Sequence, residues 1–95
     1  WCKERSATES HMLHDVHMNA GDYIRTNTAD GLSNSGEMFK SITSTGFTVG
    51  TRGEVNENSQ TYVNWSWKGG GTPSANNVGA TASSVSVNTT SGFSV

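Results

Sequence analysis

The sequence predicts an all-β fold of antiparallel strands, and two observations lead to this prediction. Ser, Thr, Asn and Gly dominate the 95-residue chain, and no run of Ala, Leu, Glu and Lys offers helix propensity. Apolar and polar side chains also alternate along Thr61–Lys68, as a strand with one buried face requires. We therefore expect one small β domain of marginal stability, because so short a chain buries only somewhat over half of its unfolded surface.

The Thr61–Lys68 strand is expected to supply much of the core. Val63, Trp65 and Trp67 share one face, and two indoles there would bury more apolar surface than any other segment. Tyr62 and Asn64 lie on the opposite, polar face. These two residues are the candidate ligand-binding residues, as contacts to a sugar.

Alternation and turn residues predict the remaining elements. Phe47 and Val49 point the same way and are expected in the core. Turns are expected at residues 19–22 and 88–92, and polar loops at residues 27–36 and 51–59. Further strands are expected at residues 1–5, 11–18, 23–26, 38–43, 46–50, 84–87 and 93–95. A hairpin is expected to join the strand at 38–43 to the strand at 46–50.

The composition changes abruptly after Lys68. Three consecutive glycines and the only proline follow, which predicts a linker. The expected organisation is a β-sandwich portion at residues 1–68, a linker at 69–83 and the start of a following β module at 84–95. Because the chain begins without Met and ends within an alternating pattern, we expect a piece of a longer polypeptide.

Charge and hydropathy exclude several classes of partner. The net charge is −2 and the six basic residues are scattered, which argues against nucleic acid as a partner. No apolar run approaches the roughly 18 residues of a membrane span, and no signal peptide is recognisable. The single cysteine, Cys2, allows no internal disulfide and is compatible with a reducing cytoplasm.

Three histidines near one aspartate raise the question of a metal site. On an extended strand His11 and His17 share a face with Asp15, whereas His14 points away. Residues six apart on a strand are also too distant to share one ion without bending. We therefore expect no metal site, and we interpret the three residues as surface or strand-edge histidines.

Glu54 and Glu57 superficially resemble the paired carboxylates of sandwich-fold glycosidases. Such catalysis requires two carboxyl groups on one face, about 5–9.5 Å apart. Residues three apart on a strand face opposite ways, and Asn56 replaces an acidic residue beside Glu54. We therefore expect a solvated loop here and no enzyme activity, with no catalytic residues and no cofactor.

Several motifs follow one another along the chain in a recognisable order: a His/Asp strand (His11, Leu13, Asp15), Gly21–Thr28, Phe39, Thr45–Gly50, Tyr62–Gly70 and Val87–Val95. This order resembles a module of structural proteins from marine tailed phages, which are similar in fold to concanavalin A-like lectins. In that family the central strand often reads Trp-Cys-Trp-Lys, and Ser66 departs from this pattern. The resemblance implies an antiparallel β-sandwich of the jelly-roll, concanavalin A-like kind that lacks its first strands. The resemblance covers nearly the whole chain.

The resemblance also implies a function. We expect a non-enzymatic structural module of a phage virion protein, in a tail, fibre or capsid decoration, that contributes to surface adhesion. Its place would be the virion, assembled in the host cytoplasm, and its partners other virion subunits, modules of the same chain or surface glycans, with a homo-oligomeric state. One alternative is a carbohydrate-binding lectin domain that uses the loops at residues 27–36 and 51–59. A glycoside hydrolase fragment, dependent on Glu54, is the least favoured.

Overall fold

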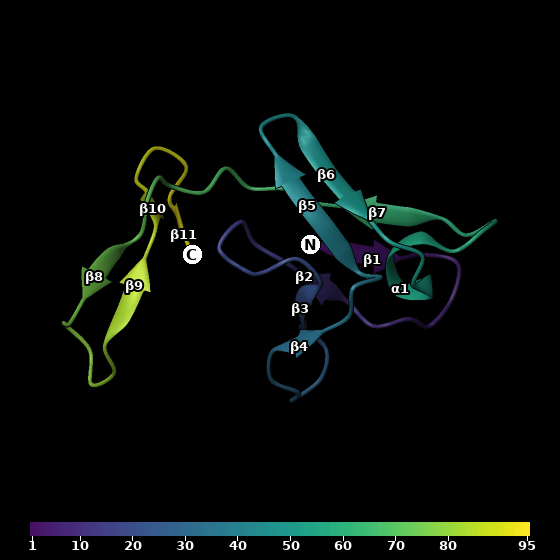
Figure 1. The fold of residues 1–95 in the computed structure, drawn as a ribbon, viewed down its shortest axis with the longest axis horizontal. Helices are drawn as coiled ribbons and strands as arrows, with labels where there is room; N and C mark the ends of the chain where they lie inside the picture. Colours follow the sequence, from purple (N-terminus) through teal and green to yellow (C-terminus); the bar gives the residue numbers. More distant parts are fainter. The chain divides into compact units, whose positions relative to one another are not determined.

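A computed structural model describes residues 1–95 and confirms the all-β prediction, with antiparallel pairing throughout (Figure 1). The chain divides into two compact units, residues 1–65 and 66–95, which are described separately. No helix is both long and apolar enough to cross a membrane.

The first unit contains a five-stranded sheet in the order β4-β3-β2-β1-β7, together with the two-stranded β5–β6 hairpin. The pairing of β1 with β7 joins segments about sixty residues apart in the sequence, which no local pattern reveals. The elements are β1 (Cys2–Glu4), β2 (Met12–Leu13), β3 (Asp22–Arg25), β4 (Ser33–Asn34), β5 (Phe39–Thr43), β6 (Gly46–Val49), α1 (Gly53–Asn56) and β7 (Tyr62–Asn64).

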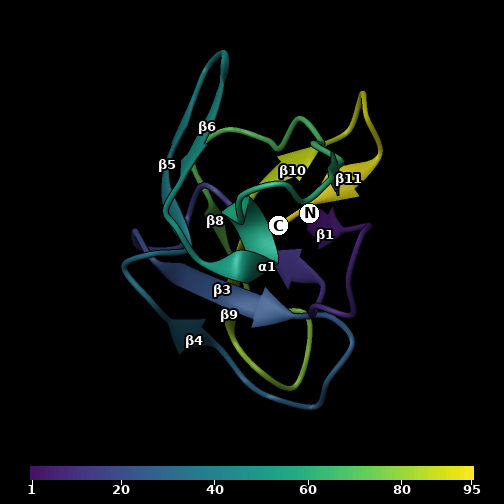
Figure 2. The ribbon, with the colours of Figure 1, turned by 90° about the vertical axis from the view of Figure 1, so that its right-hand side faces the viewer.

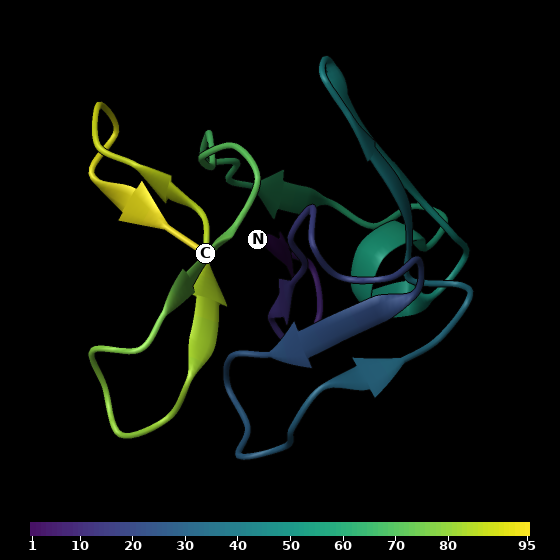
Figure 3. The ribbon, with the colours of Figure 1, turned by 60° about the vertical axis from the view of Figure 1, so that its left-hand side comes forward.

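The predicted hairpin is confirmed. Strands β5 and β6 pair with Ile42 opposite Phe47, and the hairpin projects as an arm whose turn lies away from β1 to β4 (Figures 2 and 3). Phe47 is 40% exposed, so its expected place in the core is wrong, because it lies on the projecting arm. Val49, at the base of the arm, is half-buried and packs against the core.

The core lies between the five-stranded sheet and the base of the hairpin, which is a β-sandwich-like arrangement. Met12 faces Cys2 directly across β1 and β2, and Val55 of α1 packs into the same cluster. The expected loop at residues 51–59 therefore contains a helical turn with a buried apolar side chain. The buried apolar residues are Cys2, Met12, Tyr23, Met38, Phe39 and Val55.

The face of β7 that packs on the core is opposite to the predicted one. Cys2, which is buried, pairs with Asn64, and directly opposed residues share a face of the sheet. Tyr62 accordingly packs against the core, whereas Trp65 is 47% exposed. The prediction that the indoles form the core is wrong. Residues of β1, β2 and α1 fill the core on the face of the sheet that carries Tyr62, which is opposite to the face of Trp65.

The predicted strand at residues 11–18 is much shorter in the structure. Only Met12–Leu13 forms a strand, and Val16 is exposed. The chain turns instead at Asp15, whose carboxylate accepts a hydrogen bond from the His17 N–H at 2.7 Å. The turn at residues 19–22 is confirmed, with Gly21 at φ 85°, a conformation that glycine adopts readily.

The second unit consists of two β hairpins, although the expected linker at residues 69–83 contributes one of their strands. Trp67 is 54% exposed, so its predicted burial is also wrong, and its ring stacks on Phe93 at 5.9 Å. The predicted turn at residues 88–92 is confirmed, with Gly92 at φ 67°. The paired strands are β8 (Ser74–Asn76) with β9 (Ser83–Val85) and β10 (Val87–Asn88) with β11 (Phe93–Ser94).

Candidate functional site

Three aromatic side chains meet on one face of the five-stranded sheet. Trp65, which follows β7, lies directly opposite Trp1, which precedes β1. His11 precedes β2, and the pairing of Cys2 with Met12 places it beside Lys3, so its ring reaches that of Trp1 diagonally. The ring centroids of Trp1 and Trp65 are 4.9 Å apart, and those of Trp1 and His11 are 5.4 Å apart. We call Trp65, Trp1 and His11 the aromatic row.

Backbone hydrogen bonds hold the aromatic row in place. Trp1 and Trp65 exchange two of these bonds, at 2.8 and 2.9 Å. The Thr26 N–H donates to the His11 carbonyl at 3.0 Å, and the His11 N–H donates to the Asn27 side-chain oxygen at 2.9 Å. The rings are therefore carried by strand ends rather than by a long loop, which favours a fixed binding geometry.

The orientation of the Trp1 indole is also fixed. Its Nε1–H donates to the Thr26 hydroxyl oxygen at 3.0 Å, which uses the polar edge of the ring. Trp1 is half-buried and Trp65 is 47% exposed, so apolar ring surface remains open to solvent. The hydroxyl of Thr26 lies beside Trp1, and the side-chain amide of Asn27 lies beside His11. The aromatic row therefore combines apolar ring faces with hydrogen-bonding groups. Such a surface suits a ligand with both kinds of group.

The predicted binding residues, Tyr62 and Asn64, lie on the core side of β7, away from the aromatic row. The Tyr62 hydroxyl donates to the Gly53 carbonyl at 2.5 Å and accepts a hydrogen bond from the Glu57 N–H at 2.7 Å. Burial raises the pKa of Tyr62. The hydroxyl thus fastens β7 to α1, while Asn64 is exposed. Their part in ligand binding stays a prediction.

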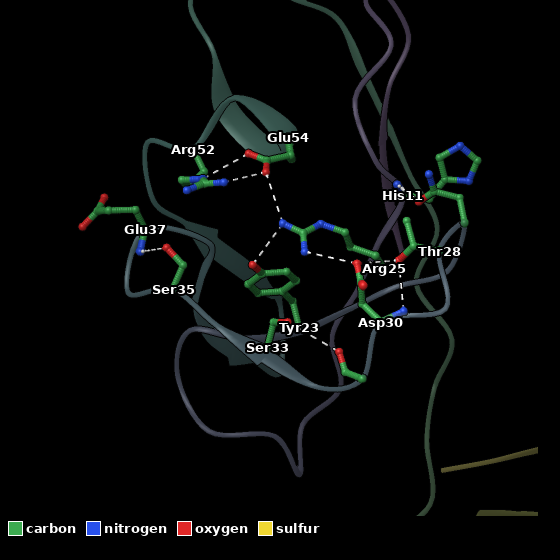
Figure 4. Close-up of polar contacts among 12 residues, drawn as sticks. His11, Tyr23, Arg25, Thr28, Asp30, Ser33, Ser35, Glu37, Arg52 and Glu54 are labelled. Carbon is green, nitrogen blue, oxygen red and sulfur yellow. Dashed lines mark hydrogen bonds and ion pairs between the residues drawn. The ribbon is translucent and has the colours of Figure 1, made fainter.

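Glu54 is buried, so its expected place in a solvated loop is wrong. Its carboxylate accepts hydrogen bonds from Arg52 at 2.8 and 3.1 Å, and Arg25 Nη2 lies 3.9 Å away (Figure 4). The Arg52 hydrogen bonds, followed by the charges of Arg52 and Arg25, lower the pKa of Glu54. A carboxylate held ionised in this way is a poor proton donor.

Arg25 connects this ion pair to the sheet. Its Nη2–H donates to the Tyr23 hydroxyl at 3.3 Å, and its guanidinium lies 5.1 Å from the centre of the Tyr23 ring. Its other terminal nitrogen lies 3.8 Å from the Asp30 carboxylate (Figure 4). The two arginines therefore neutralise the buried Glu54 carboxylate between β3 and α1, which is a structural role, whereas Asp30 is exposed.

The histidines separate in the structure. His11 joins the aromatic row, and His17 is exposed. The ring of His14 stacks on Phe39 at 4.9 Å, and its Nδ1 lies 2.7 Å from the Asp22 carbonyl oxygen. No three His, Cys, Asp or Glu side chains are grouped so as to hold a metal ion.

Cys2 lies in the core rather than in a reactive setting. It is 1% exposed, and its Sγ lies 4.0 Å from the Glu54 carbonyl oxygen. Burial raises the pKa of the thiol, which disfavours the reactive thiolate. Cys2 is therefore a packing residue.

Sequence reasoning missed Trp1 and His11 as site residues. The sequence pattern assigns Trp65 to the core and Trp1 only to a strand, and it indicates that His11 is a surface or strand-edge histidine. The row depends on the pairing of β1 with β7 and on the diagonal approach of Trp1 to His11, both of which are tertiary features.

The fold and the site define a small antiparallel β module with an exposed aromatic surface. The family model described as "Domain of unknown function (DUF7483)" matches residues 1–95, and the chain belongs to this family. No curated protein and no solved structure matches the chain.

Proposed function

We propose that the chain is a non-enzymatic structural module of a phage virion protein, in a tail, fibre or capsid decoration, that contributes to surface adhesion. The aromatic row is the observation that carries the adhesive part of the proposal. The place in a virion, after assembly in the host cytoplasm, is supported by the sequence resemblance described above, as are the jelly-roll, concanavalin A-like strand order and the partnership with other virion subunits.

The environment of the acidic residues supports a non-enzymatic role. Glu54, the carboxylate on which hydrolysis would depend, is occupied by Arg52 and Arg25. Retaining or inverting hydrolysis would require one carboxyl group with a raised pKa, whereas that of Glu54 is lowered. Binding and scaffolding therefore account for the arrangement better than glycoside hydrolysis does.

A carbohydrate is the second candidate, as the ligand of the aromatic row. The apolar face of a pyranose ring packs on an indole, and the hydroxyl groups at its rim need donors and acceptors such as Thr26 and Asn27. The exposed ring of Trp65 beside the hydrogen-bonded ring of Trp1 supports this ligand class. The loops at residues 27–36 and 51–59 remain the alternative binding surface.

Electron microscopy of virions tests the structural role. Virions that lack the parent protein should lose density at a tail, fibre or capsid surface. Unchanged density in the mutant virions would refute the proposal.

A glycan array with the purified chain tests the adhesive role. Trp65→Ala should weaken binding about two- to twelvefold, because an aromatic contact contributes about 0.5–1.5 kcal/mol. Phe47→Ala is the matched control, since Phe47 is a similarly exposed aromatic residue on the hairpin arm, outside the row. An array without signal for the wild-type chain would reject carbohydrate as the ligand. Equal losses of glycan binding in the two variants would show that the aromatic row is not the binding site.

A further inference from the structure

Strand β7 forms an open edge of the five-stranded sheet. Toward β1, the Thr61 carbonyl accepts a hydrogen bond from Arg5 at 2.8 Å, and the Trp65 N–H donates to Trp1 at 2.9 Å. Because hydrogen-bonded and non-bonded pairs alternate in an antiparallel ladder, Val63 bonds to β1 as well. The backbone groups of the residues between them, Tyr62 and Asn64, therefore point outward, away from β1.

This edge lacks the features that usually protect an open strand. The segment from Thr61 to Trp65 contains no charged residue and no proline, and the register between β1 and β7 runs without a bulge. The other edge strand, β4, is only two residues long. Unpaired donors and acceptors on a regular, uncharged strand are a template for another strand.

We propose that β7 pairs antiparallel with β7 of a second copy of this chain, about a two-fold axis through Asn64. In this register Asn64 lies opposite Asn64 of the partner subunit, and the two residues exchange both N–H···O bonds. Val63 then lies opposite the partner subunit's Trp65, so apolar side chains meet on the outer face of the joined sheet. The five strands of each copy form one continuous sheet.

The sequence around β7 favours this register over its nearest alternative. A two-fold axis through Tyr62 would place Trp65 opposite Ser59 of the partner subunit. Ser59 has φ 67°, a left-handed conformation that ends an extended ladder. The Asn64-centred register instead pairs residues 62–66, none of which has a positive φ, and it places no like charges opposite one another, which is why a second copy fits this edge.

Sedimentation velocity of the 95-residue chain over a range of concentrations tests the proposal. The wild-type chain should show a monomer–dimer equilibrium. Asn64→Pro removes the outward N–H without touching a bond to β1, and it should raise the dimer dissociation constant at least about tenfold. Asn64→Ala is the matched control: it keeps the N–H and should stay within about threefold of wild type.

Amide hydrogen exchange provides an independent readout on the unmodified chain. The Asn64 amide should become protected as concentration rises, whereas the Val63 amide, bonded to β1, should be protected at every concentration. A monomer at all concentrations would overturn the proposal, and so would a dimer in which the Asn64 amide exchanges freely. A dimer that Asn64→Pro does not weaken, with circular dichroism unchanged, would place the interface elsewhere and reject β7 pairing.

Discussion

The two units of the chain are held together by different interactions. The first unit buries six apolar side chains in one cluster. In the second unit the only buried residue is Ser86, while Val78 and Val87 are 97% and 55% exposed. Its contacts are strand pairing, the stack of Trp67 on Phe93, and polar bonds such as that from the Ser86 hydroxyl to the Gly71 carbonyl at 2.7 Å. Hydrophobic burial is the larger stabilising term in folding, so we expect the second unit to open at a lower free energy than the first.

Met12→Ala should give the largest effect and separates the two units most sharply. Met12 is fully buried, so its truncation should lower the free energy of unfolding of the first unit by about 2–5 kcal/mol. Amide hydrogen exchange resolved by residue measures this loss, and the control Val87→Ala should stay within about 0.5 kcal/mol. An equal loss of amide protection in both units would show that they unfold together, and it would contradict the expected difference in stability between them.

Gly50→Ala should destabilise the first unit by about 1–3 kcal/mol, because a Cβ at Gly50 would overlap the backbone of Glu37. The overlap lies where β6 ends beside the segment that precedes β5. Gly46→Ala, in the same hairpin, meets nothing within 4 Å and is the control. Urea denaturation followed by circular dichroism compares the two variants, and indistinguishable midpoints would contradict the expected crowding.

Phe93→Leu should have a smaller effect, confined to the second unit. The stacked pair of Phe93 and Trp67 contributes about 0.5–1.5 kcal/mol beyond the area it buries. Exchange rates of amides in β10 and β11 should rise, and those in β1 to β3 should not change. Faster exchange in the first unit would mean that the two units are not independent.

Acid should weaken only the first unit, because residues 66–95 contain no Asp, Glu or His. The pKa of Glu54 is lowered in the folded state, so its stabilisation is present above the ordinary value of 4.5 and is lost as pH falls through the folded pKa. Arg52→Ala should reduce this pH dependence by less than about 1 kcal/mol, since the Arg52 side chain is 46% exposed. Exchange measured at pH 3 and pH 6 tests this, and an acid-sensitive second unit would contradict it.

The aromatic row is the part of the candidate site that the sequence did not predict. Trp65 was placed in the core, and its neighbour Trp1 was assigned only to a strand. The row requires the backbone exchange between Trp1 and Trp65, which joins residues 64 positions apart. A carboxylate such as Glu54 was misplaced for the same reason, because Arg25, one of its partners, lies in β3.

Local chemistry in the sequence determined the all-β class, the β5–β6 hairpin, the β10–β11 hairpin and the turns at Gly21 and Gly92. Alternation and left-handed glycines act over a few neighbouring residues, so these features need no knowledge of distant contacts. Only the tertiary structure decided which face of β7 is buried. A strand with two usable faces buries the one that meets a partner, and here Cys2, Met12 and Val55 form the core on the Tyr62 side, which leaves Trp65 exposed.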